Sequence, residues 1–274
     1  MKTALAASTL LSALLLLPAV AAEPPAYHLV QTIPLGAPDR WDYLTFDPAS
    51  SRLYVSHGDR VTVVDGSTGS IIGSVEGMPG GTHGIAIANG KGYTDDGKAG
   101  AATVFDVKTL KPIRTVKAED DADGIVYDPP SGHVIVIDGD SGKLTVIDPK
   151  DDSVVATIDA GGGLEFGVSG ENGEFYVDGA EKNEVVRVDT KANTVTAHWA
   201  LKDCLRPHGM AIDRSTHRLF VSCPNQLMVV LDADTGATVA SLPIGSGTDF
   251  AVFDPVRGIP IVLCGPVPQL SECV

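Results

Sequence analysis

Short hydrophobic runs separated by polar turns extend along most of this chain, and five of the runs end in an aspartate. The run Val-Thr-Val-Val at residues 61–64, for example, precedes an aspartate and a Gly-Ser-Thr-Gly turn. The five residues are Asp65, Asp106, Asp148, Asp189 and Asp232, at spacings of 41, 42, 41 and 43 residues. A period of this length is typical of one four-stranded blade of a β-propeller. The pattern therefore predicts an all-β repeat protein.

Each repeat also contains three further runs with the composition of short strands. In the first repeat, strands are expected over residues 43–47, 52–56, 61–65 and 71–75. The same order recurs four times, and a sixth copy begins at Phe250. The sequence thus predicts propeller repeats over residues 23–258, as five complete blades and a partial sixth. Residues 259–274 contain three prolines and lack the pattern, so we expect an aberrant tail outside the repeats.

The N-terminus has the composition of a secretory signal peptide. A lysine at position 2 precedes an apolar stretch at residues 10–17, followed by Pro18 and four small residues, Ala-Val-Ala-Ala. This order predicts a signal peptide over residues 1–22 and a periplasmic or secreted mature chain. No later apolar run approaches the roughly 20 residues needed to cross a bilayer, so we expect no membrane span.

The chain is strongly acidic, with a formal net charge of −15 that becomes −16 once Lys2 is removed with the signal peptide. Such a surface repels nucleic acid and anionic lipid, which makes nucleic acid an unfavourable partner. Cations, small cationic ligands and basic proteins are electrostatically better matched. Charge therefore narrows the class of partner without naming one.

The four cysteines form no CxxC or CxxCH motif, which gives no support to a zinc ribbon or to covalent haem attachment. Cys204 lies in the loop that enters the fifth blade and Cys223 at the end of its second strand, so the fold places both on one face. In an exported chain we expect a disulfide between them. A free pair or a metal-binding pair is the alternative.

Charged or metal-binding residues stand at the entry to the innermost strand of each blade. These entry residues are Asp42, His83, Asp123, Glu165, His208 and Asp249. Because they recur with the period of the fold, we expect them around one mouth of the central channel, where a subset would bind a divalent cation such as Ca²⁺, Mg²⁺, Mn²⁺ or Zn²⁺. Loops on the same face add His57, Asp59, Asp95, Asp96, Asp138, Asp140, Asp178 and Glu181.

A structural interpretation competes with the metal site. Polar residues at a channel entrance also solvate the rim or form hydrogen bonds to neighbouring blades. The five repeated aspartates lie at the opposite ends of the blades, before turns, where aspartate accepts hydrogen bonds from the backbone of its own turn. We therefore expect those five to be structural, and no cofactor other than a divalent cation is indicated.

Segments across the chain resemble the exported YncE-like, or YVTN-type, seven-bladed β-propellers. The matching segments are Trp-Asp-Tyr-Leu-Thr at 41–45 with Asp47-Pro48, Arg-Leu-Tyr-Val-Ser at 52–56, Val-Val-Leu-Asp-Ala-Asp-Thr-Gly at 229–236 and Leu-Pro-Ile-Gly at 242–245. The resemblance implies seven blades, whereas this chain departs from the family after Gly258. The departure suggests a truncated or frameshifted product, in which Cys264 and Cys273 are accidental.

The resemblance also bears on ring closure. Residues 30–36 match the outermost strand at residues 238–245, which implies that they complete the last blade of a ring. A complete ring predicts a monomer, whereas a shortened chain predicts an open edge and edge-to-edge association.

Three functions are compatible with these patterns. The first is an exported, non-catalytic binding protein that presents an acidic channel face to a metal ion, a small ligand or a protein partner. The second is a metal-dependent hydrolase of the lactonase or phosphotriesterase-like propeller kind, with ligands among Glu165, Asp123, Asp249 and His208. The third is an interaction scaffold without a small-molecule site. GxSxG, HExxH and dinucleotide motifs are absent from the sequence, which favours the non-catalytic function.

Overall fold

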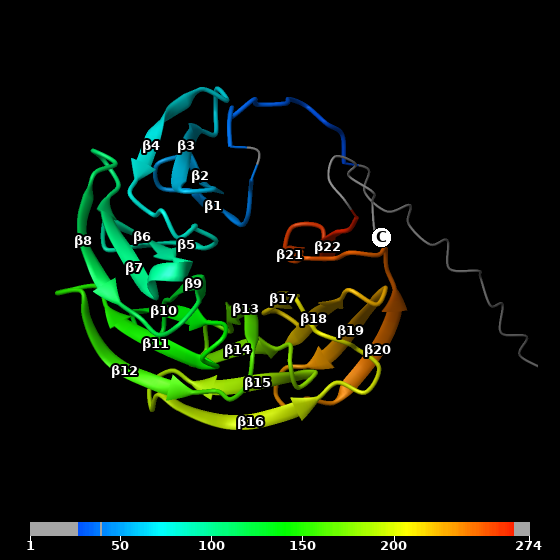
Figure 1. Ribbon diagram of the computed structural model, residues 1–274. Helices are drawn as coiled ribbons and strands as arrows, with labels where there is room; N and C mark the ends of the chain where they lie inside the picture. Colours follow the sequence, from blue (N-terminus) through cyan, green and yellow to red (C-terminus); the bar gives the residue numbers. More distant parts are fainter. Residues whose placement is uncertain (1–26, 39, 266–274) are drawn as a thin grey trace, which may run out of the picture.

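The computed structural model describes residues 27–38 and 40–265, which form an all-β fold of six sheets placed around a central axis (Figure 1). The first five sheets have four antiparallel strands each, and the sixth has two. Successive strands of each sheet are neighbours, and the first strand of every sheet lies nearest the axis. The predicted fold class, five complete blades and a partial sixth, is confirmed.

The strands have the following bounds. The first sheet contains β1 (Leu44–Asp47), β2 (Arg52–His57), β3 (Arg60–Asp65) and β4 (Ile71–Glu76). The second contains β5 (Ile85–Ala88), β6 (Lys91–Asp96), β7 (Ala101–Asp106) and β8 (Pro112–Lys117), with the 3-10 helix η1 (Gly97–Ala99) between β6 and β7. The third contains β9 (Ala122–Asp128), β10 (His133–Asp138), β11 (Lys143–Asp148) and β12 (Ser153–Asp159).

The remaining sheets follow the same order. The fourth contains β13 (Leu164–Ser169), β14 (Glu174–Gly179), β15 (Glu184–Asp189) and β16 (Thr194–Ala200). The fifth contains β17 (Gly209–Asp213), β18 (Arg218–Cys223), β19 (Leu227–Asp232) and β20 (Thr238–Pro243). The sixth contains β21 (Phe250–Asp254) and β22 (Ile259–Leu263). The strands of the first sheet agree with the expected ranges to within one residue at each end.

The repeated aspartates accept hydrogen bonds from the turn that follows the third strand, from two backbone amides in four of the five complete blades and from one, that of Lys150, at Asp148. Oδ1 of Asp65 accepts hydrogen bonds from the backbone amides of Ser67 and Thr68, both at 2.9 Å, and from the Ser67 hydroxyl at 2.6 Å. Asp106, Asp189 and Asp232 make the same pair of backbone contacts. These hydrogen bonds favour the charged carboxylate and lower the pKa of Asp65. The structural role expected from the sequence is confirmed.

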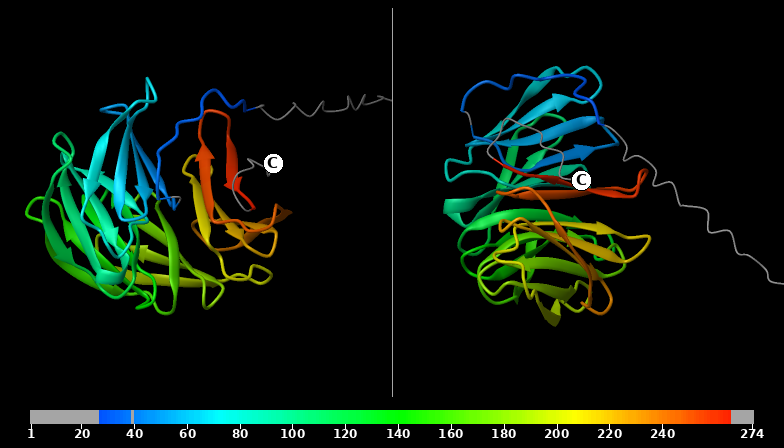
Figure 2. Two further views of the ribbon diagram at one scale, coloured as in Figure 1. Left: turned by 45° about the horizontal axis from the view of Figure 1, so that its top comes forward. Right: turned by 90° about the vertical axis from the view of Figure 1, so that its right-hand side faces the viewer.

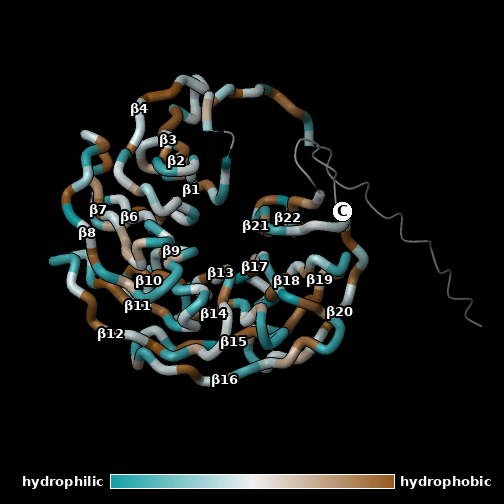
Figure 3. Tube along the Cα trace, in the orientation of Figure 1, coloured by the Kyte–Doolittle hydropathy of each residue, from teal (hydrophilic) through white to brown (hydrophobic). Residues whose placement is uncertain are grey.

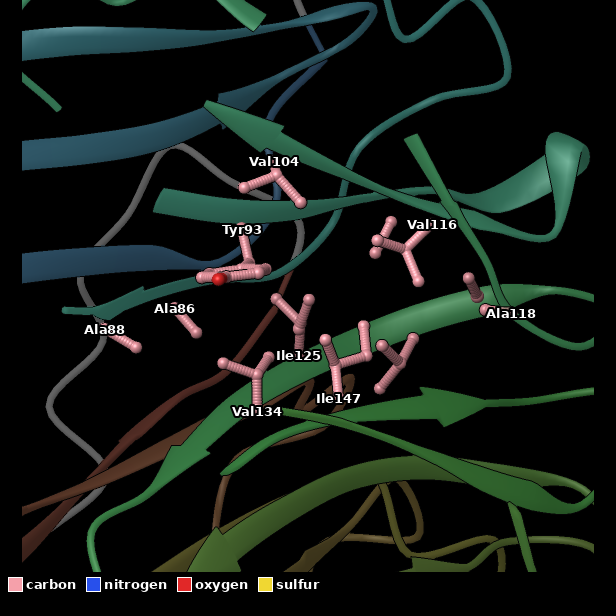
Figure 4. Close-up of a cluster of buried hydrophobic side chains, with 12 residues drawn as sticks. Ala86, Ala88, Tyr93, Val104, Val116, Ala118, Ile125, Val134 and Ile147 are labelled. Carbon is pink, nitrogen blue, oxygen red and sulfur yellow. The ribbon is translucent and has the colours of Figure 1, made fainter. Parts of the chain in front are cut away.

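Neighbouring sheets pack through apolar side chains of their middle strands. Figure 4 shows one such layer, in which Tyr93 and Val104 of the second sheet face Ile125, Val134 and Ile147 of the third. Hydrophobic residues recur along the strands of all the sheets (Figure 3), while the outermost strands keep most of their residues at least partly exposed. The second to fifth sheets therefore pack between two neighbours, as expected for repeats that stack around an axis, whereas the first and sixth sheets each pack against one.

Glycine allows the innermost strands to approach one another closely. A Cβ atom on Gly84 would lie 2.5 Å from the backbone nitrogen of Ile125 in the next sheet. A Cβ atom on Gly209 would lie 2.9 Å from the backbone nitrogen of Ala251. Both glycines directly follow an entry residue, so the inner ends of adjacent blades meet with little space between their backbones.

The repeat continues past the expected boundary at Gly258. Strand β22 pairs with β21 in antiparallel register from Ile259 opposite Asp254 to Leu263 opposite Phe250. The prediction of a non-repeat tail is therefore wrong for residues 259–263. The prolines of this segment, including Pro260, had argued against a strand. A proline is tolerated in a strand that is paired on one side only, as β22 is within the described residues. Residues 266–274, including Cys273, and the predicted signal peptide at 1–22 lie outside the described residues.

Residues 27–38 run across the open sector between the first and sixth sheets (Figures 1 and 2). At one end the Tyr27 hydroxyl donates to Oδ2 of Asp254 at 2.7 Å. At the other end the Pro38 carbonyl accepts a hydrogen bond from Nε2 of His57 at 2.6 Å. The predicted outer strand at residues 30–36 is wrong, because these residues are not in a strand and Val30 is 97% exposed. No described helix is long and apolar enough to cross a membrane.

Candidate binding site at the channel mouth

The structure places the six entry residues where the chain turns into the innermost strands. Asp123 and Glu165 are the second residues of β9 and β13, and the other four precede their strands by one or two residues. Their side chains form two groups. The first contains Asp42, His83 and Asp123, and the second contains Glu165, His208 and Asp249. We call the six residues together the acidic mouth.

His83 is the cation of the first group. Its Nδ1 atom lies 2.6 Å from Oδ2 of Asp95 on β6 and 3.5 Å from Oδ1 of Asp123. Asp95 is completely buried and also accepts hydrogen bonds from the backbone amides of His83 and Gly84, at 2.9 Å and 2.7 Å to Oδ1. The imidazole is therefore held by the Asp95 carboxylate, which is itself held by the backbone amides of His83 and Gly84.

The carboxyl groups around His83 have perturbed proton affinities. Burial tends to lower the pKa of His83, but the hydrogen bond and charge of Asp95, with the charges of Asp123 and Asp42, raise it to about 9. Burial raises the pKa of Asp123 to about 7, assisted by the charges of Asp95 and Glu165. Desolvation raises the pKa of Asp42 to about 6, although the residue as a whole is exposed. Negative charge is therefore held in this group at an energetic cost.

The second group is looser and more exposed. Nε2 of His208 lies 3.6 Å from Oε2 of Glu165 and 3.9 Å from Oδ1 of Asp249. Arg206 approaches the same glutamate, with Nη2 3.8 Å from Oε1. The Asp249 side chain is 76% exposed, whereas that of Glu165 is 20% exposed. Burial raises the pKa of Glu165, and the cationic neighbours His208 and Arg206 oppose this change.

Three aromatic residues that directly follow entry residues of the acidic mouth form a cluster. The ring centroid of Tyr43 lies 4.7 Å from that of Phe166 and 5.6 Å from that of Phe250. Burial and the charges of Asp42, Asp123, Asp249 and Glu165 together raise the pKa of Tyr43 well above its ordinary value. The hydroxyl is therefore within the field of both groups, and it forms no hydrogen bond with the described residues.

Sequence reasoning missed Tyr43, Phe166 and Phe250, although a signal for them exists. Each aromatic residue directly follows an entry residue, while glycine occupies the same place in the second, third and fifth repeats. Three aromatic residues and three glycines at one position of the period indicate rings that fill the channel where other blades provide no side chain.

Asp178 is a buried carboxyl group. The sequence predicted it only as one of several loop residues on the face of the acidic mouth. It lies on β14 opposite the irregular part of the pairing between Leu164 and Gly167, a place that corresponds to Asp95 on β6. Neither of its carboxyl oxygens has a hydrogen-bond partner among the described residues. Burial, assisted by the charge of Glu165, raises the pKa of Asp178 well above the ordinary value.

The mouth does not form a compact set of metal ligands. Within residues 27–38 and 40–265, no three histidine, cysteine, aspartate or glutamate side chains are grouped in a way that would hold a metal ion. His57, also expected on this face, is buried and used by the fold, since Nδ1 bonds the Thr62 hydroxyl at 2.8 Å and Trp41 stacks on its ring. A divalent cation at a subset of the six entry residues stays a prediction.

The expected disulfide is present next to the second group. Cys204 and Cys223 are joined, with their Cα atoms 5.4 Å apart, and both are completely buried. The bond ties the loop at residues 201–208 to the end of β18. His208 is the last residue of that loop, so the disulfide restricts the segment that positions it.

No model of a known protein family and no curated protein sequence matches this chain.

Proposed function

We propose that this protein is an exported, non-catalytic propeller of the YncE-like kind that binds an organic cation at the acidic mouth. The ligand class is a primary or secondary ammonium group, carried by a small molecule or by a lysine side chain of a basic protein. One observation carries the proposal: the charges of four carboxyl groups from four blades act on Tyr43, and the pKa values of three of them, Asp42, Asp123 and Glu165, are raised.

The carboxyl groups of the acidic mouth have little positive charge near them to compensate their own. A carboxyl group whose pKa rises on folding is one whose charged form is poorly compensated. Asp42 and Asp123 share a single cation, His83, although they are drawn from two different blades. A bound ammonium group would supply the missing positive charge and would donate hydrogen bonds to the carboxylates and to the Tyr43 hydroxyl.

The spacing of the groups favours an organic cation over a bare metal ion. His83 already uses Nδ1 for Asp95, and the two groups of the mouth lie on different blades. A flexible ammonium ligand with more than one nitrogen would reach both groups, whereas a metal ion requires its ligands at about 2.0–2.6 Å. Export is supported by the signal-like segment at residues 1–22 and by the disulfide.

The charge state of His83 supports a binding role over hydrolysis. A general base must accept a proton at the working pH. With a pKa of about 9, His83 is already protonated at neutral pH and serves as a fixed cation between carboxylates. The hydrolase alternative predicts turnover of lactones or phosphoesters with added divalent metal that disappears in Glu165→Ala, and the scaffold alternative predicts binding of neither cation nor metal.

Calorimetry with spermidine as the probe tests the proposal at low ionic strength and pH 8. We expect saturable binding at a stoichiometry of about one, weakened about fivefold to tenfold in Asp123→Asn. Asp159→Asn is the matched control, because it makes the same change of net charge at an exposed carboxylate that ends the outermost strand β12. Equal weakening in both variants would show non-specific attraction to an acidic protein and would contradict the proposed site.

A further inference from the structure

A second concave space lies inside the channel, next to the aromatic cluster. It is a cavity of about 390 Å³ lined by consecutive residues of the innermost strands β1, β5, β9 and β13. None of the six entry residues lines it, whereas Tyr43, Phe166 and Phe250 do. These three residues directly follow entry residues in the sequence, so the cavity lies next to the acidic mouth, and we call it the inner chamber.

The wall of the inner chamber is mainly apolar. Phe46 on β1 is 51% exposed, and Ile87 on β5, Tyr127 on β9 and Val168 on β13 are each partly exposed. All four line the chamber. Apolar surface facing water is unfavourable, and covering it stabilises a complex by about 25 cal/mol for each Å² removed from water. The chamber is thus suited to a ligand with an apolar body.

Aromatic rings at the end of the chamber favour an aromatic body. Phe166 and Phe250 meet edge to face, with centroids 6.0 Å apart and planes inclined by 70°. Tyr43 is tilted by 37° against Phe166. A planar ring entering the chamber would meet faces and edges of these rings in the arrangements that aromatic groups prefer.

The far end of the chamber provides a polar group with unused donors. Nη2 of Arg214, in the turn after β17, donates to the Ser169 carbonyl at 2.9 Å and lies 3.2 Å from Oε1 of Glu171. Nε and Nη1 of Arg214 make no hydrogen bond with the described residues. Arg214, Ser169 and Glu171 all line the chamber. Because Arg214 is already paired with Glu171, this end offers hydrogen-bond donors without an excess of positive charge.

We propose that the inner chamber binds a small, neutral aromatic molecule that accepts a hydrogen bond from Arg214 through a carbonyl or hydroxyl oxygen. The volume falls at the lower end of the roughly 300–1,000 Å³ of small-ligand pockets. An anionic ligand fits less well, since Glu171 lies beside Arg214 and the chain carries a formal charge of −15. This site is separate from the cation site of the proposed function and does not depend on it.

Calorimetry on the full mature chain with 2-naphthol tests the proposal, because this probe is a neutral fused-ring phenol at pH 7. Its carboxylate counterpart, 2-naphthoate, has the same ring system and a negative charge. We expect 2-naphthol to bind with a stoichiometry of one and 2-naphthoate to bind at least about tenfold more weakly. Absence of 2-naphthol binding, or tighter binding of 2-naphthoate, would overturn the proposal.

Two variants locate the site. Ile87→Trp fills the chamber and should abolish 2-naphthol binding, while the matched control Ile72→Trp places the same side chain on the outermost strand β4, where Ile72 is 42% exposed, and should bind as the parent does. Arg214→Met keeps an apolar stem, removes the donors and should weaken binding about tenfold. Retained affinity in both Ile87→Trp and Arg214→Met would place the ligand elsewhere and contradict the assignment.

Hydrogen exchange on the unmodified chain provides a readout that does not rely on a folded variant. The ligand should slow amide exchange in peptides covering β5, β9 and β13, which line the chamber. Peptides covering the outermost strands β8 and β12 should exchange at the same rate with and without it. Protection confined to the outermost strands would contradict the proposal.

Discussion

Nδ1 of His83 lies 2.6 Å from Oδ2 of Asp95, and Asp95 in turn accepts hydrogen bonds from the backbone amides of His83 and Gly84. The carboxylate therefore binds both the side chain and the backbone of the strand entry that carries the histidine. This relationship gives the acidic mouth its only strongly held cation among the six entry residues, because the contacts of His208 are longer, at 3.6 Å and 3.9 Å.

Asp95→Asn should lower the pKa of His83 from about 9 towards its ordinary value of 6.5. The amide removes the negative charge and the charge-assisted hydrogen bond that favour the imidazolium, while burial continues to oppose it. NMR titration of the imidazole resonances measures this pKa directly. Asp159→Asn, which alters a carboxylate on an outermost strand, should leave it unchanged, and an unaltered His83 pKa in Asp95→Asn would contradict the pairing.

Stability should fall as the pH rises from about 5 to about 9. His83 has a raised pKa, so its stabilisation is complete below 6.5 and is lost as the pH rises through about 9. Asp123 and Asp138 have pKa values raised from 3.8 to about 7, so ionising them on the way to neutral pH also favours the unfolded chain. The turn aspartates, such as Asp65, act in the opposite sense, and their stabilisation is lost only as the pH falls below about 4.

Urea denaturation at a series of pH values measures this dependence. The midpoint should be highest at mildly acidic pH and lower at pH 8.5. In Asp123→Asn one of the raised groups no longer ionises, so the decline between pH 5 and pH 7 should be shallower. A midpoint that increases from pH 5 to pH 8.5 would show that the buried carboxyl groups do not have raised pKa values.

Removing the disulfide should lower the free energy of unfolding by about 3 kcal/mol, as expected for a loop of this length. Cys204 and Cys223 are 19 residues apart in sequence, and both are buried. The Cys204→Ser/Cys223→Ser double variant and the parent should be compared in urea with and without reductant. Reductant should lower the midpoint of the parent towards that of the double variant, and equal midpoints without reductant would indicate that the bond contributes nothing.

Gly84→Ala should lower the free energy of unfolding by about 1–3 kcal/mol, because the added methyl group would overlap the backbone of the next blade. The new Cβ would lie 2.5 Å from the nitrogen of Ile125, a backbone atom that cannot rotate away. Gly163→Ala is the matched control, since its Cβ would have its nearest contact at 3.5 Å, with Glu181. Equal denaturation midpoints for the two variants would contradict the close approach of β5 and β9.

Much of the fold followed from the sequence because local rules repeat along it. The spacing of Asp65 and its four counterparts gave the number of complete blades, and the strands of the first sheet lie within one residue of the expected ranges. Two segments were misassigned for opposite reasons. Ile259–Leu263 pairs with β21 although its composition departs from the repeat, and residues 30–36 form no strand although their composition matches one.

The candidate site was predictable only in outline. The period correctly brought charged residues of all six sheets to the strand entries, but it gave no information on which of them touch. In the structure His83 contacts Asp95 and Asp123. His208 lies nearest Glu165 and Asp249. These pairings depend on the directions of side chains from different strands and different blades, which the period does not specify. The isolated carboxyl group of Asp178 is a consequence of burial, which is a property of the packed molecule.

The sequence alone determined the all-β class, the period of about 42 residues, the turn role of the repeated aspartates and the cysteine pair, because each depends on local chemistry or on simple periodicity. The tertiary structure decided the rest. It placed Tyr43, Phe166 and Phe250 together, from the first, fourth and sixth sheets, in the lining of the inner chamber. Contacts between residues more than 80 positions apart form only when the blades pack around one axis. The sequence of a single repeat does not determine how side chains from different blades meet.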